Sequence, residues 1–119
     1  MREIKFRALD EECEWIYGMP LTYVEYEEKE FPLMRNCDET GYWGVKKIHP
    51  KTLGQYTGLK DRNGVEIYEY SELDGVYEVI FKDLRYSLRH TQNNDIIDLY
   101  DYWRDKNGEI EVTREYTKI

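Results

Sequence analysis

The chain has 119 residues, of which 25 are acidic and 17 are basic, and its formal net charge is −8. This length suits a single domain. Duplex nucleic acid and anionic membranes both attract cationic surfaces, so an acidic chain is a poor match for either. We therefore expect neither as a partner. No run of about 18 apolar residues occurs, so no membrane-spanning helix is predicted.

Cysteine usage and the first residues bear on location. The cysteines are Cys13 and Cys37, and the start of the chain, Met1 to Lys5, lacks the apolar segment of a secretion signal. Reduced thiols and a cytoplasmic location are the expectation.

Tyrosine is unusually frequent, with 12 Tyr against 3 Trp and 3 Phe. Tyrosine favours strands and surfaces that are apolar on one side and wet on the other. One interpretation is a thin β protein whose tyrosines line a small core, and the other is an exposed aromatic binding face. We favour the first, because aromatic residues mark interfaces only when their rings are exposed.

Residues 2–9 alternate between apolar and polar side chains, which predicts a half-buried strand. After a polar break at 10–13, residues 15–17 resume the apolar pattern, so we predict a hairpin that ends at Gly18 because Pro20 interrupts it. The basic residues of the first strand are interpreted as its solvated face: Arg2, Lys5 and Arg7.

Residues 19–50 are predicted to form a long insert. The charged run 25–30 is typical of a solvated loop or edge, and the insert contains several breakers: Pro32, Gly41, Gly44 and Pro50. Residues 21–24 have strand character, and short strands are expected at 42–45 and 47–48. Long loops are often functional, so this insert is our first candidate for an adaptable surface.

The segment 54–70 carries the clearest local signals. Two glycines around Tyr56 predict a strand with a bulge at 57–59, and the sequence Asp61-Arg62-Asn63-Gly64 predicts a tight turn into a second strand. The motif residues, all interpreted as structural, are Gly54, Gln55, Tyr56, Thr57, Gly58, Leu59, Asp61, Asn63, Gly64, Ile67, Tyr68 and Glu69.

After a polar bend at 71–75, residues 76–81 are predicted to form a central strand. Residues 84–88 alternate and predict a one-sided strand, with Leu84 among its apolar residues, and 90–94 a loop.

Residues 95–104 fit either a helix capped by Asn94 or Asp95 or one strand of a hairpin. We favour the hairpin, because 105–108 repeats the turn chemistry of 61–64. A strand is expected at 109–117 in both cases.

Two separated motifs resemble the YopX family of small proteins encoded by bacteriophages and prophages. They are the opening MREIKFRA (residues 1–8) and GQYTGLKDRNG (residues 54–64), which is followed by Ile67-Tyr68-Glu69. The resemblance implies a prophage origin and a mostly β fold, and it supplies no catalytic or ligand-binding residue. In the family Ile-Tyr-Glu is usually followed by Gly-Asp, whereas here Glu69 is followed by Tyr70 and Ser71.

Catalytic and metal chemistry is not indicated by the sequence. A nucleophile–base pair would have to be assembled from dispersed residues, and the same holds for a zinc site: Cys13, Cys37, His49 and His90. Four aspartates recur at helical spacing and are interpreted as a solvated acidic face rather than a cation site: Asp95, Asp98, Asp101 and Asp105. No phosphate-binding loop is present. We expect no enzymatic activity, no metal and no cofactor.

The sequence therefore predicts a mainly β protein of antiparallel hairpins, with a small barrel-like or sandwich core and little helix. It is expected to be a single YopX-like domain over 1–119, with two lobes, 1–70 and 71–119, as an alternative. The expected function is a non-enzymatic phage or prophage accessory role in the cytoplasm of a bacterial host, through self-association or binding of a host or phage protein. The alternative is a small β-barrel that binds single-stranded nucleic acid through exposed aromatic rings. Mimicry of the charge of DNA is a weaker third reading.

Overall fold

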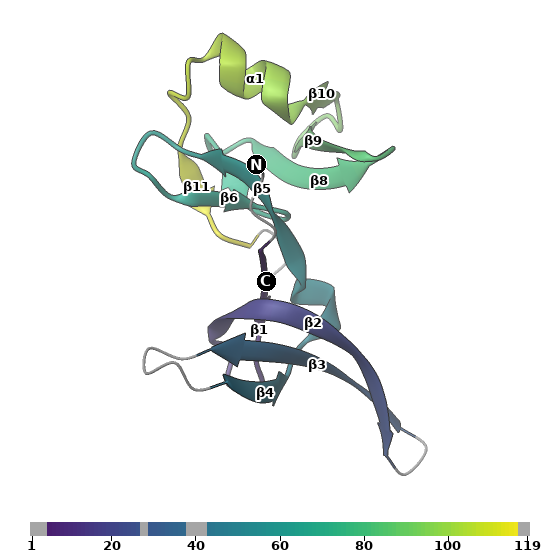
Figure 1. The fold of residues 1–119 in the computed structure, drawn as a ribbon. Helices are drawn as coiled ribbons and strands as arrows, with labels where there is room; N and C mark the ends of the chain where they lie inside the picture. The colour runs from purple at the N-terminus through teal and green to yellow at the C-terminus, as the bar shows by residue number, and fades with distance from the viewer. Residues whose placement is uncertain (1–4, 27–28, 38–42, 117–119) are drawn as a thin grey trace. The chain divides into compact units, whose positions relative to one another are not determined.

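The computed structural model describes residues 5–26, 29–37 and 43–116 (Figure 1). The fold is mainly antiparallel β with one short α-helix, which confirms the predicted class. In chain order the elements are β1 (Phe6–Leu9), β2 (Trp15–Tyr26), β3 (Lys29–Cys37), β4 (Trp43–Lys47), the 3-10 helix η1 (Pro50–Thr52), β5 (Gly54–Lys60), β6 (Glu66–Tyr68), β7 (Glu72–Leu73), β8 (Tyr77–Lys82), β9 (Arg85–His90), β10 (Ile96–Asp98), α1 (Leu99–Asp105) and β11 (Val112–Arg114).

The strands form two sheets, neither of which is a closed barrel. One has the order β4-β3-β2-β1-β5-β6 and the other β10-β9-β8-β7-β11. The chain divides into two compact units, with the boundary between Gln55 and Tyr56 inside β5. The interpretation of the whole chain as one YopX-like domain stays a prediction. No helix among the described residues is long and apolar enough to cross a membrane.

In the N-terminal unit, β1 pairs with β2 in the predicted hairpin, with Phe6 opposite Gly18. Arg7 corrects the expectation of a solvated basic face, because it is only 2% exposed. Its guanidinium lies 4.1 Å from the centre of the Trp15 ring. A guanidinium is weakly hydrated and stacks on aromatic faces, so it tolerates this position better than lysine would. Arg2 lies outside the described residues.

The described β1–β2 pairing ends at Gly18, as predicted, but Pro20 does not stop the strand, since β2 continues to Tyr26. Pairing of β2 with β1 stops at Gly18, whereas pairing with β3 continues. Among the described residues, Pro20 pairs with β3 alone, and a sheet tolerates a residue without an N–H where a strand is paired on one side only.

The predicted long insert at 19–50 is wrong as a loop, because β2, β3 and β4 form a continuous antiparallel array, although the expected strands at 21–24 and 42–45 overlap β2 and β4. Pro32 falls where the β2–β3 register shifts, between the pairs Leu21–Leu33 and Val24–Phe31. A break in register relieves the need for a ladder hydrogen bond at proline. The charged run 25–30 includes the last two residues of β2 and the first two of β3. Its middle, 27–28, lies outside the described residues.

Each unit has its own core. In the N-terminal unit the hydrophobic core cluster consists of Ala8, Ile16, Met34 and Ile48. In the C-terminal unit it consists of Ile67, Leu73, Val79, Tyr86, Leu88, Leu99 and Ile110. As predicted, β8 is the central strand of its sheet. The bend at 71–75 contains a short strand, β7, that pairs with β8 and with β11.

The favoured hairpin at 95–104 is wrong. Residues 96–98 are a strand, and residues 99–105 form the helix α1. Asp98, rather than Asn94 or Asp95, caps the helix by accepting the N–H of Asp101 at 3.0 Å. The predicted hairpin turn at 105–108 instead ends the helix: Gly108 has φ +74° and donates its N–H to the carbonyl of Trp103. The final strand, predicted for 109–117, is limited to β11.

Candidate functional site

The motif at 54–70 begins with a bulge centred on Gly58, as predicted. Gly58 has φ +89°, and the β5–β6 register shifts between Tyr56 and Lys60. The Thr57 side chain is fully buried and donates to the carbonyl of Ile67 at 2.7 Å. Gly54 and Gln55, ahead of the bulge, pair with β1. Each of these residues therefore has a backbone or packing role.

Asp61 joins the motif turn to the last strand. Its Oδ1 accepts the N–H groups of Asn63 (2.8 Å) and Val65 (2.9 Å), and its Oδ2 accepts the N–H of Val112 (2.9 Å). Gly64 supplies the positive φ of +80° that the turn requires. One buried carboxylate thus ties β5, β6 and β11 together.

Tyr56 is buried and packs on Tyr68, with ring centroids 5.4 Å apart. The position after Glu69, where the family usually has glycine, is Tyr70, and it adopts φ +71°. Ser71 follows, fully buried, and its hydroxyl accepts the N–H of Tyr68. The turn that enters β7 is therefore left-handed at position 70 although the glycine is replaced.

Helix α1 provides donors to the same motif. Tyr100 donates its hydroxyl to the carbonyl of Thr57 at 2.8 Å, and Trp103 donates its Nε1 to the carbonyl of Lys60 at 3.0 Å. These carbonyls flank the bulge, where the ladder is interrupted. Tyr100 and Trp103 are three positions apart, so a helix presents both on one face.

A second polar link joins α1 to the strands. Tyr102 donates its hydroxyl to Asp74 Oδ2 at 2.6 Å, while Asp74 Oδ1 accepts the N–H of Glu111 at 3.0 Å. Burial, and next the hydrogen bond to Asp74, raises the pKa of Tyr102 well above its usual value near 10. Burial also raises the pKa of Tyr70 and of Tyr116, with added repulsion from Glu69 and Glu78 for Tyr70 and from Glu78 for Tyr116.

These tyrosines predict that the C-terminal unit loses stability at alkaline pH. A raised folded-state pKa means that the unfolded chain releases its protons first, so stability falls as the pH rises above about 10. In the Tyr102→Phe variant, the free energy of unfolding is expected to fall less steeply as the pH rises above about 10. Urea unfolding at several pH values measures it, and the range between about pH 7 and pH 9 is the control, because tyrosines stay protonated there in both states. An unchanged slope in the variant would contradict the assignment to Tyr102.

The histidines and the described cysteine do not form a catalytic or zinc constellation. Cys13 and His49 lie exposed in the N-terminal unit, whereas His90 lies in the C-terminal unit. His90 Nδ1 accepts the N–H of Gln92 at 3.2 Å, and its ring contacts Tyr77 edge-on. The side chain of Cys37 lies outside the part that the structure describes.

The four aspartates at helical spacing have separate local environments. Asp98 caps α1 and lies 3.7 Å from Arg85, and Asp101 pairs with Arg104 at 2.6 Å. Asp95 is in a turn, and Asp105 is the last residue of α1. Neither pairing resembles a shared cation site.

Most of the described aromatic side chains are buried or half-buried. Tyr17 and Phe81 alone among them are exposed, and they belong to different units. A face of adjacent exposed rings, on which bases of single-stranded nucleic acid would stack, is therefore not found in the part of the chain whose side chains are described.

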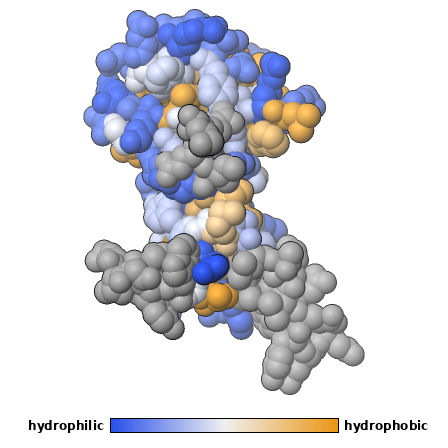
Figure 2. All heavy atoms as spheres, viewed as in Figure 1, coloured by the Kyte–Doolittle hydropathy of each residue, from blue (hydrophilic) through white to orange (hydrophobic). Residues whose placement is uncertain are grey.

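The tip of the β8–β9 hairpin departs from the predicted pattern. Leu84 was expected on the buried side of a strand, but it lies in the turn and is 91% exposed. Asp83 and Leu84 both have positive φ, +52° and +65°, because a two-residue hairpin turn of this kind requires it at both positions. Phe81, on β8, is 51% exposed. Figure 2 shows hydrophobic atoms at the free end of this hairpin beside strongly hydrophilic ones.

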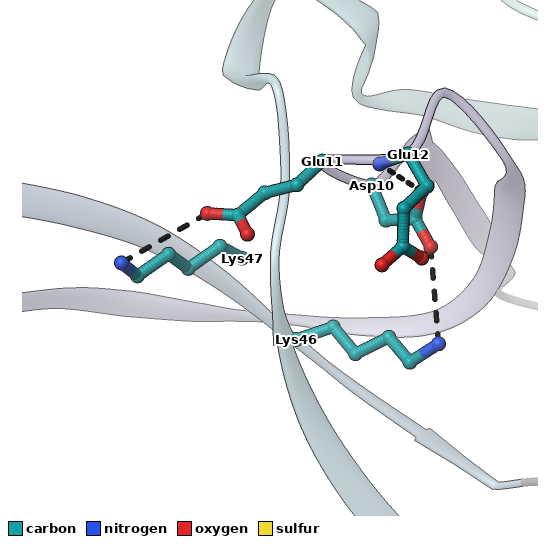
Figure 3. A pocket seen from close by; sticks show the side chains of 5 residues that line it. All are labelled: Asp10, Glu11, Glu12, Lys46 and Lys47. Carbon is teal, nitrogen blue, oxygen red and sulfur yellow. Dashed lines mark hydrogen bonds and ion pairs between the residues drawn. The ribbon is translucent and has the colours of Figure 1, made fainter.

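An open pocket of about 220 Å³ lies beside the β1–β2 turn and is lined by Asp10, Glu11, Glu12, Lys46 and Lys47 (Figure 3). Lys46 Nζ is 3.8 Å from Asp10 Oδ2, and Lys47 Nζ is 3.9 Å from Glu11 Oε1. The sequence reasoning treated residues 10–13 only as a polar break and missed this pocket.

The turns at 10–14 and 61–65 nevertheless share one design, which the sequence signals only through the aspartate that begins each turn. In each, the aspartate Oδ1 accepts the N–H groups two and four residues on. The fourth residue has positive φ in both, Cys13 at +59° and Gly64 at +80°.

Comparison with known proteins gives one family. The chain matches the family model described as YopX protein over residues 5–112, which is most of its length and includes both units. No curated protein and no solved structure matches it. The motif at 54–70, whose bulge and turn are described above, lies inside the matched region. The chain belongs to the YopX family.

Proposed function

We propose that this YopX-family protein is a non-enzymatic accessory protein of a bacteriophage or prophage. It acts in the cytoplasm of the bacterial host by associating with a second copy of itself through the tip of the β8–β9 hairpin. The phage origin is proposed from the family resemblance, and the mode of action from the tip.

The observation that carries the proposal is Leu84. A leucine with a left-handed backbone costs roughly 1–2 kcal/mol relative to its ordinary conformations, and glycine usually occupies this turn position. The side chain is 91% exposed, so burial within its own chain does not offset this cost. Strained backbone at an exposed apolar residue is typical of a binding surface.

The tip is suited to binding the same tip on a second copy of the chain. Leu84 is flanked by cations and an acid, Lys82, Arg85 and Asp83. In a two-fold interface the same patch faces itself, which brings Asp83 of each copy toward the cations of the other while the leucines meet at the centre. The net charge of −8 makes this locally basic tip a favourable point of approach for another acidic chain.

Leu84→Gly provides the test, because it removes the side chain and relieves the turn. We expect the variant to lose self-association, measured as a lower mass by light scattering, while its free energy of unfolding rises by roughly 0.5–1 kcal/mol. A leucine with a merely structural role would not produce these opposite effects. Val45→Ala is the matched control, since Val45 is an exposed apolar residue in the N-terminal unit.

Two outcomes contradict self-association through the tip. One is a wild-type protein that stays monomeric at all concentrations. In that case the partner of the tip would be a different protein. The other is a Leu84→Gly variant that keeps the wild-type mass.

The non-enzymatic part of the proposal is supported by the placement of the reactive side chains. His49 and Cys13 are exposed, and the described contacts of His90 are local. A general base must lie within hydrogen-bond reach of the proton that it removes and be held there. Among the described residues we find no nucleophile positioned by such a base.

A further inference from the structure

The strongest unassigned feature is a group of three carboxylates on the β1–β2 turn: Asp10, Glu12 and Glu14. One oxygen of each lies within 4.8 Å of an oxygen of the other two. Like charges at this separation repel by about 1 kcal/mol in water and by several times more where water is partly excluded. The fold nevertheless holds them together, because Asp10 Oδ1 accepts the N–H groups of both glutamates at 2.9 Å.

A second observation points to a ligand. The Asp10 side chain is 3% exposed, and its Oδ2 is buried without a hydrogen-bond donor. The two bonds to Oδ1 hold the carboxylate so that Oδ2 points toward Lys46 Nζ, beside the Glu12 carboxylate, among the residues that line the pocket (Figure 3). The described cation beside it, Lys46 Nζ, is 3.8 Å away, which is beyond hydrogen-bond length. A buried carboxylate oxygen without a donor is costly and calls for an ion or another partner.

We propose that Asp10, Glu12 and Glu14 bind a divalent cation of the size of Ca²⁺. This inference departs from the sequence-based expectation of no metal site. Ca²⁺ takes oxygen ligands at about 2.3–2.6 Å, so ligands on opposite sides of the ion lie roughly 4.6–5.2 Å apart. The three carboxylate oxygens lie within 4.8 Å of one another, so one ion of this size can reach all three. Mg²⁺ demands near-ideal octahedral geometry and gives up its water reluctantly, so three carboxylates on one turn suit Ca²⁺ better.

Lys46 has a defined role in this proposal. Its flexible ammonium supplies part of the counter-charge when the site holds no metal, and the divalent ion displaces it. The three carboxylates supply three protein ligands and water completes the shell, so the affinity falls in the weak range, with a Kd of about 10⁻⁴–10⁻³ M. Such an ion would fix the β1–β2 turn.

The test is a titration of the full chain with Ca²⁺. Binding is measured by calorimetry and stability by the melting temperature, and NaCl at matched ionic strength serves as the control. Ca²⁺ is expected to raise the melting temperature, and Glu12→Gln or Glu14→Gln to weaken binding by about tenfold. Both glutamates are exposed, so these variants are expected to fold. Lys46→Met is expected to strengthen binding by roughly threefold to tenfold, because it removes the competing charge.

Glu11→Gln is the matched control. Glu11 lies on the same turn and lines the same pocket, but it is outside the three-carboxylate group and pairs with Lys47. The variant carries the same change of charge and is expected to bind Ca²⁺ as the wild type does. Mn²⁺ used as a paramagnetic probe is expected to broaden the amide signals of residues 10–14 first.

The proposal is overturned if millimolar Ca²⁺ leaves the melting temperature unchanged. It is equally overturned if Glu11→Gln and Glu12→Gln weaken binding alike, since that result means diffuse attraction to an acidic surface. A Lys46→Met variant that binds more weakly than the wild type would also count against it.

Discussion

Asp61→Ala is expected to lower the free energy of unfolding by roughly 3 kcal/mol. The buried carboxylate accepts three backbone N–H groups, those of Asn63, Val65 and Val112. Hydrogen bonds to a charged acceptor contribute about 1.5–3 kcal/mol each, and water recovers part of the loss because Asn63 and Val65 are exposed. Urea unfolding of the wild type and the variant measures this difference in unfolding free energy.

The same substitution has a local signature. The N–H of Val112 belongs to β11 and is bonded to Asp61 Oδ2, so its hydrogen exchange is expected to accelerate more than that of Val79 in the central strand. A short edge strand opens at lower free energy than a buried one. Asp61→Asn keeps one acceptor oxygen and is expected to cost about half as much as alanine.

Asp95→Ala is the control for Asp61→Ala, because it makes the same change of charge at an exposed turn position in the same unit. Surface substitutions of this kind usually change stability by less than about 0.5 kcal/mol. Equal losses of unfolding free energy in the two variants would mean that Asp61 acts only through net charge. The assigned hydrogen bonds would then not account for the effect of Asp61→Ala.

The features of the fold that the sequence predicted are those encoded by neighbouring residues. The bulge at Gly58 and the turn at Asp61–Gly64 depend on glycine backbones and on one aspartate side chain that reaches its own next residues. The central strand β8 is likewise a local run of β-prone residues. Such signals need no knowledge of the partner strand.

The two prolines in strands show why the insert was misread. Whether a strand tolerates proline depends on whether another strand pairs with it at that residue. Pro20 lies beyond the last described pair between β1 and β2, and Pro32 lies at a register shift. Both facts concern pairing with other strands, so Pro20 and Pro32 looked like breaks from the sequence alone.

The candidate cation site was hidden for a similar reason. Its alternating acids, Asp10, Glu12 and Glu14, read as a polar break. The lysine that faces Asp10, Lys46, comes from β4, which is distant from the turn in the sequence. Only the fold shows that Asp10 is buried and that its second oxygen lacks a donor.

Leu99→Ala is expected to cost about 3 kcal/mol, within the range for buried leucine truncations. Leu99 is the buried residue of α1 and packs in the C-terminal core with Leu88 and Val79. A helix of 7 residues is unstable on its own, so this anchor and its polar links hold it in place. The missed helix is thereby explained, because its stability comes from the core and from the carbonyls of the bulge rather than from its own residues.

Ile96→Ala is the matched control for Leu99→Ala, since Ile96 is an aliphatic residue three positions earlier that is 44% exposed. It is expected to cost less than about 1 kcal/mol. If α1 is tethered as described, Leu99→Ala also accelerates exchange at Trp103 Nε1, which donates to Lys60. Loss of stability without that acceleration would show that the helix stays docked through Tyr100 and Trp103, so that Leu99 fills the core but does not anchor the helix.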